Sequence, residues 1–229
     1  MPKLSKRLEI LASLVPFGAR VCDIGTDHAF LAIELMRTKR ACSVIATDIN
    51  EKPLQKAKIN VEKSEQSGII LRLCDGLAAV ESGEVDTVIV LGMGGEVIAG
   101  ILDRADWLKN EDITLILQPM TSSWLLREYL YKNGFDIIKE PTLIEKGKVY
   151  SVMQVRFDGK VRNADMASAT IGKIETVTAS DILYLKKQYI RCNQCAIKLE
   201  KVEEKRQEYI EYSDTALKIK TILEEHNAI

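Results

Sequence analysis

Hydrophobic and polar positions along the first third of the chain change their period repeatedly. Short apolar runs rich in β-branched residues, typical of buried strands, alternate with stretches whose apolar residues recur every three or four positions, typical of helices. This alternation predicts helix 4–14, strand 20–25, helix 29–37, strand 43–48, helix 51–64 and strand 69–73. Strands that alternate with helices favour a parallel sheet covered on both faces.

Two later segments, residues 87–91 and 113–117, are almost wholly apolar. Strands buried on both faces of a parallel sheet have this composition. A helix over 124–133 is expected to stop at Gly134, because glycine commonly ends helices. Strands 135–139 and 149–157, joined through 146–148, are expected to close the sheet as an antiparallel pair. The predicted fold class is α/β, a doubly wound Rossmann-like sheet.

The pattern changes after Gly172, since residues 173–229 contain no glycine or proline. Residues Thr178 and Asp181 resemble a capping box at a helix start. Apolar or small residues then recur in steps of three and four, the spacing of a coiled-coil seam. The seam consists of Ile182, Leu185, Tyr189, Cys192, Ala196 and Leu199.

A second run with the same steps, from Tyr209 to Leu223, is out of phase with the first. We therefore predict two antiparallel helices, with the turn at 203–208 or at 213–214. The predicted domains are a Rossmann-like domain (1–160) and a C-terminal helical coiled-coil domain (161–229).

Composition indicates a soluble globular protein, with 46% hydrophobic and 28% charged residues. The chain has no apolar run of about 18 residues or more, so no membrane span is expected, and Met1 is not followed by a secretion signal. The formal net charge is −1, so a nucleic-acid partner requires a local basic patch. We expect a cytoplasmic protein that is a monomer in solution.

The cysteines number five, at irregular spacing, which favours reduced thiols. Cys192 and Cys195 form a lone CxxC, whereas a structural zinc site needs four close ligands. The two histidines, His28 and His226, have no metal-type neighbours in sequence. We expect helix packing for the CxxC and no metal site, with metal or redox chemistry as the alternative.

Glycines and carboxylates cluster where the predicted parallel strands end, which is where ligands bind in such sheets. Gly25 allows close backbone approach after the first strand, and the Asp48 carboxylate after the second can accept two hydrogen bonds from a ribose diol. The third strand end would meet an adenine edge, and the fourth is expected to be a bare glycine loop. The expected cofactor-binding residues are Asp23, Ile24, Gly25, Thr26, Asp48, Ile49, Asp75, Gly76, Gly92, Met93 and Gly94.

The chemistry of this edge favours S-adenosylmethionine over a dinucleotide. A dinucleotide site requires G-x-G-x-x-G after the first strand, but this chain has one glycine there, and Asp27 would repel a pyrophosphate. The same carboxylates suit a cationic sulfonium cofactor without phosphate. A purely structural role for these residues is the alternative.

Several segments resemble the bacterial TrmK family. They are Leu4-Ser5-Lys6-Arg7-Leu8, Leu14-Val15-Pro16, Asp23-Ile24-Gly25-Thr26-Asp27-His28-Ala29, Gly92-Met93-Gly94-Gly95 and Gln118-Pro119-Met120. The resemblance implies a Rossmann-like fold with a C-terminal helical hairpin. It also implies methyl transfer from S-adenosylmethionine to N1 of adenine 22 in tRNA.

The loop after the fourth strand agrees with N1 chemistry. Adenine-N6 methyltransferases carry Asp/Asn-Pro-Pro-aromatic there, whereas this chain has Gly92-Met93-Gly94-Gly95. The N1 lone pair lies in the ring plane, so it needs mainly exposure and in-line alignment with the sulfonium methyl group. The base must leave its local structure to be reached, and a nearby carboxylate or carbonyl stabilises the cationic product.

Three residues are catalytic candidates. Asp27 and His28 follow the first strand, where they would face the methyl group or the target base; a helix cap and a histidine bonded to backbone are the alternatives. Gln118 is expected to end the fifth strand, and its amide suits an adenine edge or a loop hydrogen bond.

Two groups of cations are candidates for RNA contact, with a solvated surface as the alternative for each. Lys6 and Arg7 lie on the first helix. Opposite the coiled-coil seam, cations fall at the outward heptad positions with no acid among them, a pattern that suits a phosphate backbone. This basic stripe consists of Lys187, Arg191, Lys198, Lys201 and Lys205.

The sequence alone leaves other functions open. One is a methyltransferase for another RNA site or a small molecule. Another is a non-catalytic RNA-binding protein with a degenerate cofactor pocket, against which the intact Asp23, Gly25, Asp48 and Asp75 argue. A dehydrogenase would need a nicotinamide pocket, which the sequence does not show.

Overall fold

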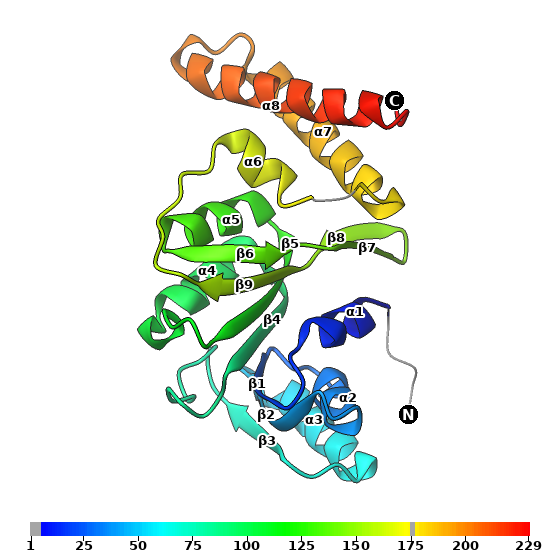
Figure 1. Ribbon diagram of the computed structural model, residues 1–229, viewed down its shortest axis with the longest axis vertical. Coiled ribbons are helices and arrows are strands. Elements are labelled where there is room, and N and C mark those ends of the chain that lie inside the picture. Colours follow the sequence, from blue (N-terminus) through cyan, green and yellow to red (C-terminus); the bar gives the residue numbers. More distant parts are fainter. Residues whose placement is uncertain (1–5, 175–176) are drawn as a thin grey trace.

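The computed structural model describes residues 6–174 and 177–229, with the backbone only for Lys6 (Figure 1). Residues 4 and 5 of the first predicted helix lie outside this range. The elements up to the fourth strand are α1 (Lys6–Leu14), β1 (Ala19–Ile24), α2 (Phe30–Arg37), β2 (Ala41–Asp48), α3 (Glu51–Ser64), β3 (Ile69–Leu73) and β4 (Thr87–Gly94). Those that follow are α4 (Gly95–Asp103), the 3-10 helix η1 (Asp106–Leu108), β5 (Thr114–Thr121), α5 (Ser123–Lys132), β6 (Phe135–Lys139), β7 (Thr142–Glu145), β8 (Lys148–Ser151), β9 (Met153–Phe157), α6 (Met166–Ile171), α7 (Ala179–Leu199), the 3-10 helix η2 (Glu203–Lys205) and α8 (Arg206–Glu225).

The central sheet has seven strands in the order β3-β2-β1-β4-β5-β9-β6. Strands β1 to β5 pair in parallel, whereas β9 runs antiparallel to both β5 and β6. This topology confirms the predicted Rossmann-like class. The strand order reverses between β1 and β4, so their carboxyl ends border the crevice in which such sheets bind ligands.

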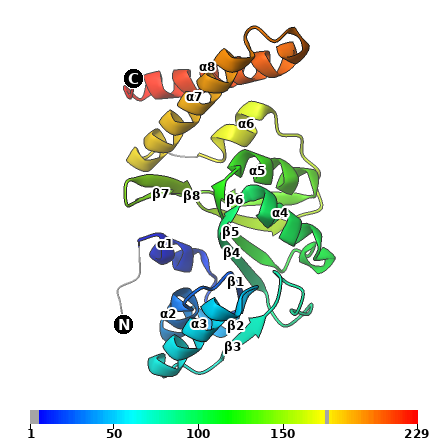
Figure 2. The ribbon, with the colours of Figure 1, turned by 180° about the vertical axis from the view of Figure 1, so that it is seen from behind.

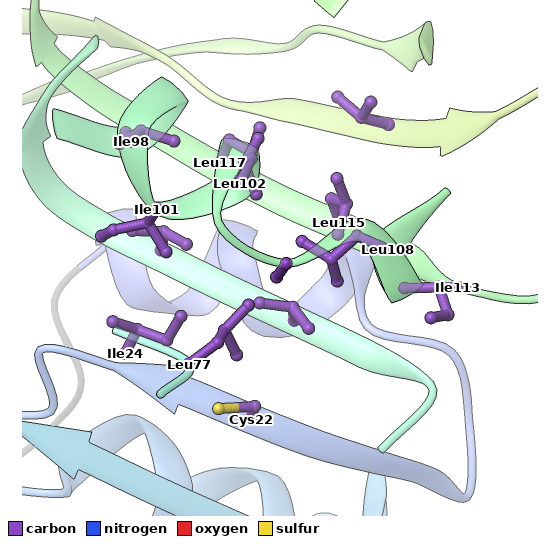
Figure 3. Packing of buried hydrophobic residues seen from close by; sticks show 14 of the residues in the cluster. Cys22, Ile24, Leu77, Ile98, Ile101, Leu102, Leu108, Ile113, Leu115 and Leu117 are labelled. Atoms are coloured by element: carbon purple, nitrogen blue, oxygen red, sulfur yellow. The ribbon is translucent and has the colours of Figure 1, made fainter. Parts of the chain in front are cut away.

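Alternate residues of the central strands belong to two separate cores. On one face Cys22 and Leu115 belong to the same core as Ile98 of α4 (Figure 3). On the other face Ile89 belongs to a core with Leu35 of α2. Because both faces are covered, these strands are apolar at nearly every position, which is the pattern seen in the sequence.

Strands β4 and β5 are longer than the sequence predicted. Strand β4 continues through Gly94 with register shifts around Met93, because β5 extends beside it to Thr121. The expectation of a bare loop at 92–94 is therefore wrong. For the same reason Gln118 lies within β5 and does not end it.

The predicted strand 149–157 is two strands. Val152, fully buried, separates β8 from β9. Strand β9 pairs with β6 as expected, but β8 forms its own two-stranded sheet with β7. The β7–β8 turn has positive φ at Lys146 (49°) and Gly147 (73°), as a tight two-residue hairpin requires.

The C-terminal hairpin consists of α7 and α8, as predicted, and α6 is an additional short helix before it. Thr178 and Asp181 form the expected capping box at the start of α7. Cys192, Leu185 and Ile219 share one buried cluster, so Cys192 packs as the heptad pattern indicated. Both views place the hairpin at the opposite end of the molecule from β3 (Figures 1 and 2). The chain reverses over 200–205, which overlaps the first predicted turn (203–208).

A buried ion pair attaches this tail to the sheet. The Arg127 guanidinium of α5 donates to Glu140 (Nε–Oε1, 3.0 Å), and the two side chains are 0% and 2% exposed. It also donates to the backbone oxygen of Thr170 (3.2 Å) and the hydroxyl of Tyr184 in α7 (2.8 Å). Burial acts to lower the pKa of Arg127, but Glu140 and Tyr184 raise it overall, so the guanidinium stays charged. Segments from α5, the β6–β7 connection, α6 and α7 therefore meet at one side chain.

The five cysteines carry free thiols. Among the described residues, no helix is long and apolar enough to cross a membrane. Within the same ranges, no group of three or more His, Cys, Asp or Glu side chains is arranged to hold a metal ion.

Candidate active site

The carboxyl ends of β1 to β4 lie side by side at one edge of the sheet. Ile24, the last residue of β1, is level with Thr47 of β2 and Val90 of β4, and Asp48 is level with Leu73 of β3. The predicted cofactor residues, from different parts of the sequence, are therefore brought together.

The turn after β1 is built around a buried carboxylate. Asp23 is 3% exposed, and the Thr26 hydroxyl donates to its Oδ2 at 2.7 Å. Burial raises the pKa of Asp23 to about 6, against the lowering effect of Thr26. Gly25 has φ of +76°, and a Cβ there would lie 2.7 Å from the Met93 methyl carbon. This turn therefore favours glycine at position 25, and the Asp23 side chain is buried beneath it.

The raised pKa of Asp23 predicts a pH-dependent stability. The folded protein holds this proton more tightly than the unfolded chain, so its stabilising effect is complete below about pH 4 and is lost as pH rises through about 6. Asp23→Asn, which keeps the acceptor for Thr26, should be more stable than the parent above that range, by roughly 3 kcal/mol. Urea unfolding of both proteins from about pH 5 to about pH 8 measures the gap. Parallel curves would show that Asp23 titrates normally.

The ends of β2 and β3 carry the residues that were predicted to contact an adenosine. Asp48 Oδ1 accepts from the backbone N–H of Asn50 at 2.8 Å, which orients the carboxylate. Ile49 beside it is 64% exposed, an apolar surface at a polar strand end. Asp75 pairs with Arg104 at 3.2 Å, and both side chains are more than half exposed. Because such surface pairs are weak, Asp75 can exchange this partner for a ligand.

The end of β4 leaves room for a ligand. Gly92 has φ of +74°, and a Cβ there would have no atom within 4 Å. Gly95 differs, since a Cβ there would lie 2.3 Å from the Ser122 carbonyl oxygen. Open space at Gly92, carboxylates at Asp48 and Asp75 and the apolar Ile49 fit S-adenosylmethionine, which is cationic at sulfur and has an apolar adenine face.

Asp27 and His28 lie at the mouth of this edge, as predicted. Helix α2 begins only at Phe30 and has no side-chain cap hydrogen bond, so Asp27 is not the helix cap. Asp27 Oδ2 lies 3.4 Å from His28 Nε2, and the His28 ring stacks on Phe30 with centroids 5.2 Å apart. Phe30 was not predicted as a site residue; the signal available in the sequence was an aromatic residue two positions after His28. Its side chain is 37% exposed.

Gln118 is not at the surface of the site. It is 0% exposed, its Nε2 donates to the Pro119 carbonyl oxygen at 2.9 Å, and its Oε1 accepts from Arg7 at 3.3 Å. Arg7 also pairs with Glu145 of the β7–β8 hairpin at 3.7 Å. The prediction that Gln118 reads an adenine edge directly disagrees with this geometry. The stated alternative was a hydrogen bond to a loop; the bond to backbone is present, but its acceptor Pro119 belongs to strand β5.

The cations predicted to contact RNA differ in exposure and in their place on the tail, which the heptad pattern did not indicate. Lys187 and Lys198 are exposed on α7, whereas Arg191 is half-buried and donates to Thr170 Oγ1 at 3.3 Å. Lys201 and Lys205 lie beyond the end of α7 at Leu199, and Lys205 pairs with Glu208 at 3.2 Å. A single continuous stripe is therefore wrong, because the helix ends and the chain reverses. The Lys6 side chain lies outside the described residues.

Comparisons with known proteins agree with this geometry. Residues 4–153 match the family described as a methyltransferase domain. The crystal structure of the Bacillus subtilis tRNA methyltransferase TrmK, which acts on adenine 22, superposes with a TM-score of 0.85 at 32% identity, covering 97% of this chain and 100% of that one. This chain belongs to the TrmK family of methyltransferases. The match extends through the C-terminal hairpin.

Two further comparisons connect the family to a substrate and a cofactor. The curated tRNA (adenine(22)-N(1))-methyltransferase of Bacillus subtilis is 42% identical over 153 residues, an alignment that covers 66% of this chain and 64% of that relative. A Streptococcus pneumoniae protein described as a putative tRNA (m1A22) methyltransferase, solved with S-adenosyl-L-methionine, has a TM-score of 0.80 at 32% identity, covering 93% of this chain and 100% of that one. In its sequence alignment, the chain spans slightly less than two thirds of the curated relative.

Proposed function

We propose that this protein transfers a methyl group from S-adenosylmethionine to N1 of adenine 22 in tRNA. The observation that carries the proposal is the convergence of Gly25, Asp48, Asp75 and Gly92 at one sheet edge, beside the Asp27–His28–Phe30 surface, in a chain of the TrmK family. Action on tRNA places the protein in the cytoplasm, and we keep the monomer as our prediction for its solution state.

Each strand end has a separate part in cofactor binding. Asp48 accepts hydrogen bonds from the ribose hydroxyls, Ile49 covers the adenine face, and Asp75 with the Gly76 backbone meets the adenine edge. The open space at Gly92 admits the methionine moiety. Bound S-adenosylmethionine supplies an activated methyl group, and the carboxylate of Asp23 beneath the turn favours its positive charge.

The residues after β1 position the target base. A flipped adenine stacks on the His28 and Phe30 rings, which are parallel to within 14°, so its N1 edge can point at the cofactor. The exposed Asp27 carboxylate stabilises the positive charge that N1 methylation leaves on the base. Alignment supplies most of the rate, because displacement at a methyl carbon needs a narrow approach angle.

Removing the His28 ring should reduce methylation without affecting the cofactor. Loss of aromatic stacking costs about 1–3 kcal/mol, so kcat/KM for tRNA should fall about 5- to 150-fold in His28→Ala. Cofactor affinity, measured by calorimetry, should be unchanged. Phe17→Ala is the control, since Phe17 is an exposed aromatic residue just before β1, away from its carboxyl end. Parent-like turnover of His28→Ala would remove His28 from the base site.

The function itself is tested with unmodified tRNA transcripts and S-adenosylmethionine. Mass spectrometry of the digested product should show 1-methyladenosine, and a transcript with guanine at position 22 should remain unmodified. Methylation elsewhere would favour the rival RNA site. Cofactor binding without RNA methylation would favour a small-molecule substrate, and absence of cofactor binding would favour an RNA-binding protein.

We also propose that residues 1–160 carry out the transfer and that residues 161–229 dock the tRNA. The buried contacts of Arg127 with Thr170 and Tyr184 support this division, because they hold the tail in a defined orientation.

A further inference from the structure

A groove beside the candidate active site is lined by aromatic rings, hydroxyl groups and cations. It lies between the carboxyl end of β5, the start of α5, strand β8 and helix α7, and has a volume of about 550 Å³. This volume is typical of a site for a small ligand or a single residue of a polymer, roughly 300–1,000 Å³. Aromatic rings, hydroxyl groups and cations line it, including Thr121, Ser123, Trp124, Tyr150, Lys187 and Arg191.

The lining of the groove is positively charged, with Lys187 and Arg191 as its charged residues. Its described lining contains no Asp or Glu, although the whole chain has a formal net charge of −1. The cavity between α1 and the start of α7, by contrast, includes Glu140 and Asp181. Within residues 6–174 and 177–229, Lys187 has no ion-pair partner, and Arg191 bonds to neutral groups such as Thr170 Oγ1. Two uncompensated cations in a hollow favour an anionic ligand.

The groove begins next to the reaction site. Thr121 at its β5 end is level with Gly94 of β4, the last of the glycines at the candidate cofactor site. From there the groove passes Trp124 and Tyr150 and reaches Lys187 on α7. The groove therefore connects the carboxyl ends of the strands with helix α7. A polymeric substrate whose reacting unit lies at these strand ends can continue into the groove.

We propose, resting on the proposed function, that this groove binds the nucleotide adjoining the target adenine of tRNA. The base lies against Trp124 and Tyr150, and the phosphate lies at Lys187 and Arg191. Aromatic rings stack any base and so accept different tRNA sequences, while lysine and arginine bind phosphate through charge-assisted hydrogen bonds. The C-terminal tail then holds the RNA strand that carries the target base, in addition to attracting the negatively charged tRNA.

Lys187→Glu tests the phosphate contact, with Lys63→Glu as its control. Both lysines are exposed on a helix, but Lys63 belongs to the last turn of α3 and does not line the groove. At roughly 0.1 M salt, loss of one phosphate contact weakens binding about sixfold, and charge reversal adds repulsion. KM for tRNA should rise at least about tenfold in Lys187→Glu and much less in Lys63→Glu, with cofactor affinity unchanged in both. Equal effects of the two variants, or no effect of Lys187→Glu, would overturn the proposal.

Trp124 tests the base contact by a separate signal. The chain has two tryptophans, so Trp107→Phe leaves Trp124 as the only one. Its fluorescence should be quenched by tRNA and by a short single-stranded oligoribonucleotide. Trp124→Ala should raise KM for tRNA at least about fivefold, and Trp124→Phe should restore it. An unquenched Trp124, or quenching by a free mononucleotide but not by RNA, would overturn the assignment.

These outcomes separate the groove from the proposed function. If the parent forms 1-methyladenosine in tRNA and the groove variants match it, only the groove proposal fails. If the parent forms none, the proposed function fails, and the oligoribonucleotide fluorescence still decides whether the groove binds RNA.

Discussion

Arg127→Met should unfold far more readily than the parent, with a loss of about 3–5 kcal/mol in the free energy of unfolding. The substitution leaves the Glu140 carboxylate charged and buried without its partner. It also removes the donors to the Thr170 carbonyl oxygen and the Tyr184 hydroxyl. Urea unfolding should report this loss, together with a fall in melting temperature of roughly 6–20 °C.

The control for Arg127→Met is Arg37→Met, which breaks an exposed pair with Glu34. That variant should unfold like the parent, because solvent and salt screen surface pairs. The double variant Arg127→Met/Glu140→Leu should recover part of the stability, since it removes the unpaired charge. If Arg127→Met unfolded like Arg37→Met, the buried pair would not be what attaches the tail.

The second large effect is on cofactor binding, which Asp48→Ala should weaken about 10- to 150-fold. This corresponds to the loss of hydrogen bonds to a charged acceptor, about 1.5–3 kcal/mol. The backbone N–H of Asn50 donates to the Asp48 carboxylate at 2.8 Å and fixes its orientation. Little reorganisation is therefore needed when the ribose hydroxyls bind. Calorimetric titration with S-adenosylmethionine measures the change.

Two variants separate the ribose contact from a general charge effect. Glu51→Ala removes an exposed carboxylate at the start of α3, three residues after Asp48, and should leave cofactor affinity intact. Asp48→Asn keeps one acceptor oxygen and should fall between Asp48→Ala and the parent. Unchanged affinity in Asp48→Ala would show that the ribose is bound elsewhere.

Elements defined by interactions between residues close together in sequence were predicted correctly, whereas elements that depend on a distant partner were not. Helix α3 and strand β3 have the predicted bounds, 51–64 and 69–73, because local periodicity and flanking turns define them. Strand β8 was absorbed into a longer predicted strand and β7 was not predicted, since alternation alone does not say which partner a strand has. Helix α6 was missed because six residues are too few for a clear helical period.

The candidate site divides in the same way. The positions of Asp48 and Gly25 at strand ends could be predicted from sequence, because the end of a parallel strand is marked by a local change from apolar to polar or glycine residues. Gln118 has the same local signal but is buried, since β5 extends past it and Arg7 of α1 covers it. Phe30 was overlooked because a single aromatic residue at a helix start usually belongs to the core.

The sequence by itself determined the alternation of strands and helices from α1 to β3, the strand ends that carry the candidate cofactor residues, and the coiled-coil seam of the tail. These features depend on the period of apolar residues and on turn chemistry, which act over a few residues. The tertiary structure alone decided that Arg127 ties the tail to the sheet, that Gln118 is buried, and that Trp124, Tyr150 and Lys187 line one groove. The physical reason is that each of these depends on contacts between segments far apart in the chain, whose relative positions follow from packing against the shared sheet and have no local signature.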